Sequence, residues 1–290
     1  MPAVPASSFP HDSRLLDTRE ADSHIEVANV LLKDVGARLQ ALESYLEAAR
    51  TSPAAGSKLA AADDLTPYNP LSFQVRSCLS VGVDSIRMVC RFIEVAKELP
   101  MLAHYAPLRV AVESTSLGIW LLGSGTKQKR AWQSLRLSYR NNEDLEGLES
   151  VLEAANETRP DRQWVRERLR GLQADLPDYR NHDLTKFPNN TDLVIEADRR
   201  VAAKRMALNG LQVWKSCSGV AHANDDVIRT LLERVPIERT ERGYIFHMTS
   251  RMLLTAAFAV TAVENAEVLR DQIEEASASA GSTSGARRGG

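Results

Sequence analysis

This sequence has few cysteines and few aromatic side chains, and it has no large excess of positive or negative charge. Three of the 290 residues are cysteines, 6% are aromatic, and 36 basic side chains nearly balance 38 acidic ones. The near-neutral total gives no general affinity for nucleic acid or for an anionic membrane. An odd number of cysteines without metal-ligand spacing predicts reduced thiols packed inside a cytoplasmic protein.

Targeting and membrane signals are missing as well. The first residues lack the basic start and the apolar run of a secretory signal. The apolar stretch from Met252 to Val263 has 12 residues, whereas a membrane span needs about 20. We therefore expect a buried helix there, no membrane contact and a cytoplasmic location. Arginine greatly outnumbers lysine, which is typical of a GC-rich bacterial genome.

Apolar residues recur at helical spacing through most of the chain. Leu31, Val35, Leu39, Leu42 and Leu46 follow one another every three or four residues, as they do on one face of a helix. The same pattern, with its breaks at proline and glycine, predicts helices over about 17–50, 71–99, 107–123, 127–139, 144–156, 160–176, 192–219, 224–234 and 245–275. The strand-like residues 244–246 are too few to predict a strand.

The predicted fold is therefore all-α, an irregular bundle of about eight to nine helices with flexible termini. Residues 1–13 are rich in proline and serine, and residues 276–290 are rich in serine, glycine and alanine. Both compositions are typical of disordered segments. Residues 14–275 form a single predicted helical domain, in which long loops at 51–70 and 177–191 are either lids or slack connections.

The stretch from Leu108 to Leu122 points most directly to a site. It is apolar on nearly every side, which predicts a buried helix, but it carries one narrow stripe formed by Arg109, Glu113, Ser116 and Trp120. Buried charges need partners because their desolvation costs several kcal/mol. We expect either a structural ion pair or a polar pocket in which the guanidinium binds a carboxylate or phosphate.

A second candidate lies in the stretch from Trp214 to Asp226. Ser218 and His222 are four residues apart and share a face if the helix continues, and Asn224 is suited to start the next helix. A histidine here is a hydrogen-bonded side chain at a helix junction, a base or a metal ligand. The candidate catalytic residues are thus Arg109, Glu113, Ser218 and His222.

Known cofactor and metal signatures are missing. The sequence has no His-Glu-x-x-His motif, no paired cysteine motif, no Glu-x-x-His pair and no phosphate-binding glycine loop. We therefore predict no cofactor and no metal.

Basic residues cluster locally despite the neutral total. One group lies on one face of the helix predicted over 160–176, namely Arg159, Arg162, Arg166 and Arg170. A second group extends from Lys127 to Arg140, and a third includes Arg199 and Arg200. If these groups converge, they form a surface for RNA or for an acidic protein partner; otherwise they are solvated faces balanced by nearby glutamates. The sequence is also compatible with a homo-oligomer.

Three segments together resemble a family of uncharacterised all-helical proteins from actinobacteria. These are LRVAVES followed by IWLL, the basic stretch through Arg130 and Arg136, and SGVAH. The resemblance covers roughly residues 71–226 and carries no assigned activity. It implies that Arg109 and Glu113 meet the pair at 218 and 222 in the fold.

More loosely, the chain resembles the HEPN superfamily, small helical bundles that include toxin and antiphage ribonucleases. Their motif is an arginine followed by four to six residues and a histidine. Here Arg180 and His182 are separated by one residue, and the residue seven before His222 is Lys215. The sequence thus predicts a helical module that binds a partner or a small ligand, with a HEPN-like ribonuclease or other hydrolase as the alternative.

Overall fold

The computed structural model describes residues 16–48, 52–97, 99–123, 125–152, 162–202, 208–241 and 243–279. The predicted disordered segment 1–13 and most of the predicted tail lie outside these ranges. The last helix ends at Ser277, and Ala276 is buried. The folded part therefore extends slightly beyond the predicted boundary at 275.

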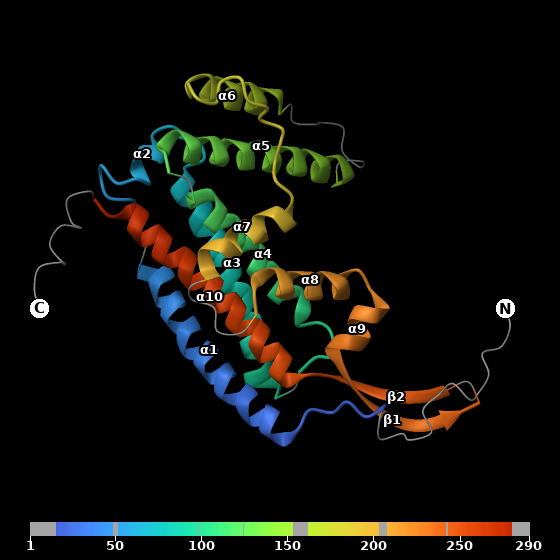
Figure 1. Cartoon of the computed structure of the whole chain (residues 1–290). Helices are drawn as coiled ribbons and strands as arrows, with labels where there is room; N and C mark the ends of the chain where they lie inside the picture. The colour runs from blue at the N-terminus through green and yellow to red at the C-terminus, as the bar shows by residue number, and fades with distance from the viewer. Residues whose placement is uncertain are drawn as a thin grey trace, which may run out of the picture.

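The described part of the chain is mostly helical, as predicted, and it includes one small sheet (Figure 1). The helices are α1 (Asp22–Ala48), α2 (Ala60–Asp63), α3 (Leu71–Arg91), the π-helical turn η3 (Phe92–Ala96), α4 (Tyr105–Leu122), α5 (Lys127–Leu152), α6 (Gln163–Ala174), α7 (Asn190–Val201), α8 (Gly210–Ala221), α9 (Asp225–Leu231) and α10 (Met252–Ser277). Strands β1 (Leu232–Thr240) and β2 (Gly243–Ser250) separate the last two helices.

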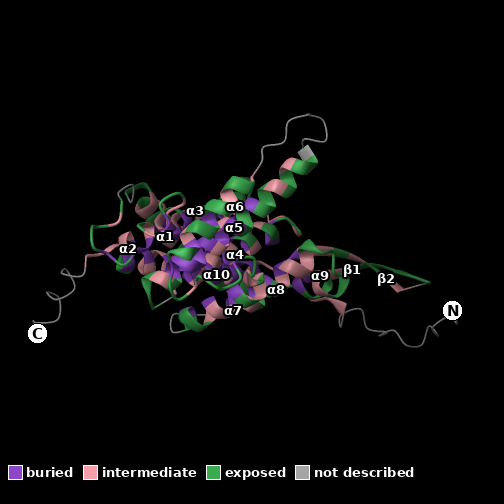
Figure 2. Cartoon of the chain, turned by 90° about the horizontal axis from the view of Figure 1, so that it is seen from above, coloured by how far each residue is buried: buried purple, intermediate pink, exposed green. Residues whose placement is uncertain are grey.

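Helices α3, α4 and α10 form the centre of the molecule, where buried residues concentrate (Figure 2). We call the cluster of buried side chains from α1, α3, α4, α7, α8 and α10 the main core; Leu79, Leu108 and Phe258 are among its fully or almost fully buried members. Helix α4 approaches its neighbours closely at Gly118. A Cβ atom there would lie 2.5 Å from Leu269 Cδ2 and 3.1 Å from Cys78 Cβ. Glycine thus allows three helices to meet at one point.

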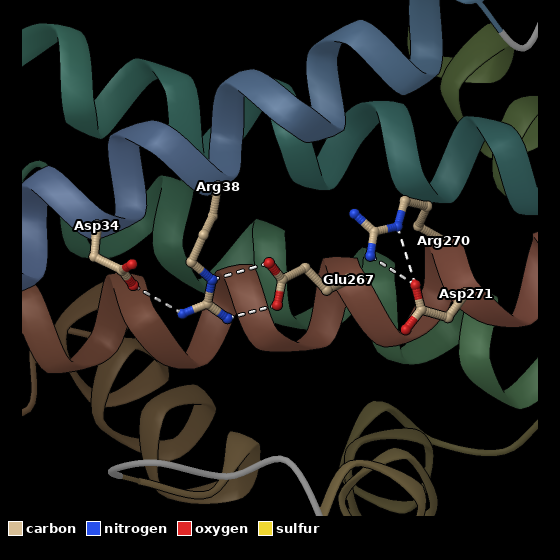
Figure 3. A network of polar contacts seen from close by, with 5 residues as sticks. All are labelled: Asp34, Arg38, Glu267, Arg270 and Asp271. Atoms are coloured by element: carbon tan, nitrogen blue, oxygen red, sulfur yellow. Dashed lines mark hydrogen bonds and ion pairs between the residues drawn. The ribbon is translucent and has the colours of Figure 1, made fainter. Parts of the chain in front are cut away.

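Helix α1 lies parallel to α10 and is joined to it by charged side chains (Figures 1 and 3). The Arg38 guanidinium donates to both carboxylate oxygens of Glu267, at 2.9 and 2.6 Å, and to Asp34 at 3.2 Å. A two-pronged arginine–carboxylate contact fixes direction as well as distance. These bonds raise the pKa of Arg38. The pairing therefore fixes the register of α1 on the core.

Helix α10 is the one helix of the described residues that is long and apolar enough to cross a membrane. However, 72% of its most apolar window is buried inside the protein. Burial by neighbouring helices is typical of the core helix of a soluble protein. The prediction of a buried helix over Met252 to Val263 is therefore confirmed.

Helices α5 and α6 pack together beside this core and form a second buried cluster. We call it the aromatic cluster; its members are Ala131, Trp132, Leu135, Tyr139, Leu169, Leu176 and Leu184. Trp132 stacks on Tyr179 with ring centroids 5.6 Å apart. Figure 1 shows α5 lying across one end of the molecule with α6 alongside.

Strands β1 and β2 pair as an antiparallel hairpin that projects from the helices (Figure 1). The pairing register shifts between Pro236 and Glu238, where proline removes a ladder donor. The segment before α1 binds both the hairpin and α10. Thr18 exchanges two hydrogen bonds of 2.9 Å with Arg234, and the Glu20 carboxylate accepts from the amide nitrogens at 252 and 253.

Several predicted boundaries are wrong. The helices predicted over 127–139 and 144–156 are one continuous helix as far as Leu152, where the described range ends, and the helix predicted over 192–219 is divided into α7 and α8. A short helix lies within the predicted loop 51–70. The helix predicted over 245–275 is wrong at its start, because residues 243–250 form β2, which is stabilised by pairing with β1, and α10 begins only at Met252. Helix α9 does begin after Asn224, whose side chain accepts from the Val227 amide, as predicted.

Candidate functional site

Arg109 and Glu113 of α4 meet side chains from α7 and α8. One Glu113 oxygen accepts a short hydrogen bond from Asn190 Nδ2. The other accepts from Trp214 Nε1 at 3.2 Å and lies 3.3 Å from Arg109 Nε. The Arg109 guanidinium carbon lies 5.7 Å from the centroid of the Trp214 ring. A single carboxylate therefore holds an arginine, an indole and an amide in fixed positions.

The ion pair lines a cavity of about 420 Å³, within the usual range for small-molecule sites. Its other walls are largely apolar and include Val110, Leu117 and Phe187. Glu113 and Phe187 also line a second, more polar cavity of about 840 Å³ on the side of α5. Glu113 thus stands where an apolar and a polar cavity adjoin.

The expectation of full burial is wrong for this pair. The Arg109 and Glu113 side chains keep 25% and 30% of their surface exposed, whereas Ser116 is fully buried and Trp120 is half-buried. The physical reason is the cavity, which opens the stripe to solvent at its N-terminal end. Of the two predictions for the pair, a sealed structural contact and a pocket wall, this exposure favours the pocket wall.

Ser218 and His222 lie at the end of α8 and line a different cavity, of about 620 Å³. His222 is exposed at the C-terminal cap of α8, and its amide donates to the Ser218 carbonyl at 3.0 Å. Ala223 then takes a positive φ of 52° and turns the chain into α9. No hydrogen bond or ion pair between described residues joins this pair to Arg109 or Glu113. The meeting of all four that the resemblance implies therefore has no contact to support it.

Trp214 and Asn190 complete the site, and sequence reasoning missed both. Trp214 lies on α8: its Nε1 donates to Glu113, and its side chain lines both the cavity of about 840 Å³ and the cavity of His222. Asn190 begins α7, next to the capping residue Asn189. The signal that could have found Trp214 is the position of a tryptophan four residues before Ser218 on one helix face. Asn190 carries no such signal.

The first basic group is largely neutralised where the structure describes it. Arg162 donates to Glu149 and Arg166 to Glu146, so both hold α6 against α5. Arg170 is exposed, and Arg159 lies outside the described residues. These contacts match the alternative in which nearby glutamates balance the basic face. They leave little free positive charge for an RNA surface on this helix.

The three cysteines are free and buried, as predicted for reduced thiols. Burial raises the pKa of Cys78 and of Cys217 to about 12 and that of Cys90 to about 11. Protonated, enclosed thiols are poor nucleophiles. Within the described ranges, no group of three or more histidine, cysteine, aspartate or glutamate side chains could hold a metal ion.

Comparison with known proteins finds no family model, no curated protein and no solved structure that matches the chain. The resemblances to the actinobacterial family and to the HEPN superfamily therefore stay predictions.

Proposed function

We propose that this protein is a ligand-binding helical module whose site is the cavity beside Arg109. The ligand we propose is a small apolar molecule that carries a carboxylate. The observation behind this proposal is a guanidinium at the wall of an apolar cavity, held in place by Glu113 and the ring of Trp214. Arginine recognises carboxylates because its planar fork offers two parallel donors.

The arrangement of donors supports an anionic ligand. The Glu113 carboxylate accepts hydrogen bonds from Asn190 and Trp214. It also forms an ion pair with Arg109, whose buried Nε lies 3.3 Å away and has no hydrogen-bond partner within the described part of the chain. No acceptor among the described residues takes a hydrogen bond from the Arg109 Nη atoms. A carboxylate in the cavity would supply that acceptor, while the apolar walls at Val110 and Leu117 would cover the rest of the ligand.

The test is a titration with octanoate, followed by calorimetry and by the indole N–H signals of the four tryptophans. Octanoate should shift the Trp214 signal, assigned with Trp214→Phe, and should leave the exposed Trp164 unchanged. Octanol, with a chain of similar length and no charge, should bind about tenfold or more weakly, because a charge-assisted hydrogen bond contributes about 1.5–3 kcal/mol. Equal binding of octanol and octanoate, or no binding of either, would overturn the proposal.

A matched pair of variants locates the site. Arg109→Gln should weaken octanoate binding about tenfold or more. Arg229→Gln removes an arginine from a pair of the same i,i+4 spacing, Asp225–Arg229, which is exposed and lies outside the cavity. This control should bind octanoate normally. Equal affinities of the two variants would refute the assignment to Arg109.

An RNA-cleaving hydrolase of the toxin or antiphage type is the second proposal. It is supported by one observation: exposed His222 lines a cavity together with Ser218 and Lys215, a base, a hydroxyl and a cation. If the proposal holds, the purified protein cleaves RNA, His222→Ala abolishes cleavage, and His247→Ala, at another exposed histidine, leaves cleavage intact. Cleavage that survives His222→Ala would reject it. For either function we propose a bacterial protein, because arginine greatly outnumbers lysine, and a cytoplasmic one, because its three thiols are free.

A further inference from the structure

A third cavity combines aromatic rings with several cationic side chains. Its volume is about 470 Å³, and it lies between the end of α4, the first half of α5, the loop before α7, and α7 itself. The residues that matter are Trp120, Trp132, Arg136, Tyr179, Arg199 and Arg200. This cavity shares no lining residue with the Arg109 cavity.

Arg136 is the central side chain of this cavity. Its guanidinium carbon lies 5.6 Å from the ring centroid of Trp120, 5.8 Å from that of Trp132 and 6.0 Å from that of Phe187. Its Nε donates a short hydrogen bond to the Lys186 carbonyl. Three rings and one carbonyl therefore fix the direction of the guanidinium.

The charge of Arg136 is not neutralised by an ion pair within the described residues. Asp183 acts on it only through its field, and burial lowers the pKa of the guanidinium. Arg199 and Arg200 are different, because both pair with Glu196. The lining nevertheless includes more cations than carboxylates, since Lys129 and three arginines face only Asp192 and Glu196. The cavity therefore favours an anion.

The convergence of these cations comes from the tertiary structure. Arg136 belongs to the basic stretch from Lys127 to Arg140, and Arg199 and Arg200 belong to a separate group on α7. The sequence predicted an RNA or acidic-partner surface only if such groups met. They meet here, next to tryptophan and tyrosine rings, rather than on α6.

We infer that this cavity binds a nucleoside phosphate, either as a free nucleotide or as one unit of an RNA strand. Arginine suits the phosphate because its fork matches two phosphate oxygens. Aromatic rings beside arginine are the usual surroundings of an unpaired base. An acidic peptide would use the cations alone, whereas the rings of Trp120 and Tyr179, which are only half-buried and line the cavity, also offer a surface for a base.

The experiment compares AMP, adenosine, inorganic phosphate and a single-stranded oligoadenylate, each titrated into the full chain at low salt. AMP should bind about tenfold or more tightly than adenosine and than inorganic phosphate, because it engages both halves of the cavity. Binding of AMP at that level identifies a free nucleotide as a sufficient ligand. Binding of the oligonucleotide alone, weakening steeply with salt, identifies RNA. If adenosine or inorganic phosphate binds with the same affinity as AMP, or if none of these ligands binds, the inference is overturned.

Variants on one helix locate the site. Arg136→Gln should weaken AMP binding about tenfold or more, and Arg136→Lys should restore only part of the loss, because lysine keeps the charge without the fork. Arg140→Gln, one turn further along α5 and outside the cavity, should bind AMP normally. If Arg136→Gln fails to fold, Arg199→Gln at an exposed position serves instead and should also weaken binding. Normal AMP binding by every lining variant would refute the site. Octanoate should not displace AMP, so this inference and the proposed function can fail independently.

Discussion

The main core and the aromatic cluster bury their side chains in different ways. In the main core, helices approach so closely that a glycine is needed at Gly118, and polar side chains such as His104 are bonded inside. In the aromatic cluster, rings stack and arginines of α6 pair with glutamates of α5. A Cβ atom added at Gly118 would clash with its neighbours, whereas one added at Gly171 on α6 would meet nothing within 4 Å. This difference predicts where substitutions and pH will matter.

The largest expected effect is an acid sensitivity of the main core. His104 is buried, its Nδ1 lies 2.8 Å from the Pro100 carbonyl and its Nε2 lies 3.0 Å from Thr255 Oγ1. Burial lowers the pKa of His104 to about 4 from 6.5. Below pH 6.5 His104 is protonated in the unfolded chain but stays neutral in the folded chain. The free energy of unfolding therefore falls as the pH drops toward 4. The loss should reach about 3 kcal/mol at pH 4.

Urea unfolding at a series of pH values checks this prediction against His104→Gln. The variant lacks the titrating ring, so its stability should depend less on pH between 6.5 and 4. All carboxylates are common to both proteins, and the difference between the two curves therefore isolates the histidine. Parallel curves would show that His104 does not stay neutral in the folded protein.

The next effect tests packing in the two regions with one kind of substitution. Gly118→Ala places a Cβ atom against Leu269 and Cys78 in the main core and should cost about 2 kcal/mol by overpacking. Gly171→Ala on α6 meets nothing within 4 Å and should stabilise by about 0.5–1 kcal/mol through helix propensity. Thermal or urea unfolding measures both. Equal signs for the two changes would break the comparison between the regions.

The smallest effect distinguishes an arginine that pairs with a glutamate, Arg162, from one that lies against aromatic rings, Arg136. Arg162→Met removes a partner from Glu149, whose side chain is only 18% exposed, and should cost about 1–2 kcal/mol. Arg136→Met removes a cation that forms no ion pair with a carboxylate among the described residues, so it should cost less than about 1 kcal/mol. Urea unfolding of both variants provides the measurement. A larger loss at Arg136 than at Arg162 would show that its contacts with the rings are mainly structural.

Local patterns predicted most of the fold and only part of the site. Helical spacing located nearly every helix, and Asn224 correctly predicted a helix start, because both signals depend on neighbouring residues alone. The pairing of β1 with β2 was not predictable from a three-residue signal. For the site, the i,i+4 spacing placed Arg109 beside Glu113. This spacing does not predict Asn190, because that residue belongs to another helix, α7.

The sequence by itself determined a helical protein with free, buried cysteines and an arginine–glutamate pair on α4, since spacing along one chain fixes which side chains share a helix face. Only the tertiary structure decided which charges are neutralised. Packing placed glutamates opposite Arg162 and Arg166 and placed aromatic rings around Arg136. Whether a charge is compensated depends on the neighbours that folding brings within a few ångströms, and those neighbours are remote in sequence.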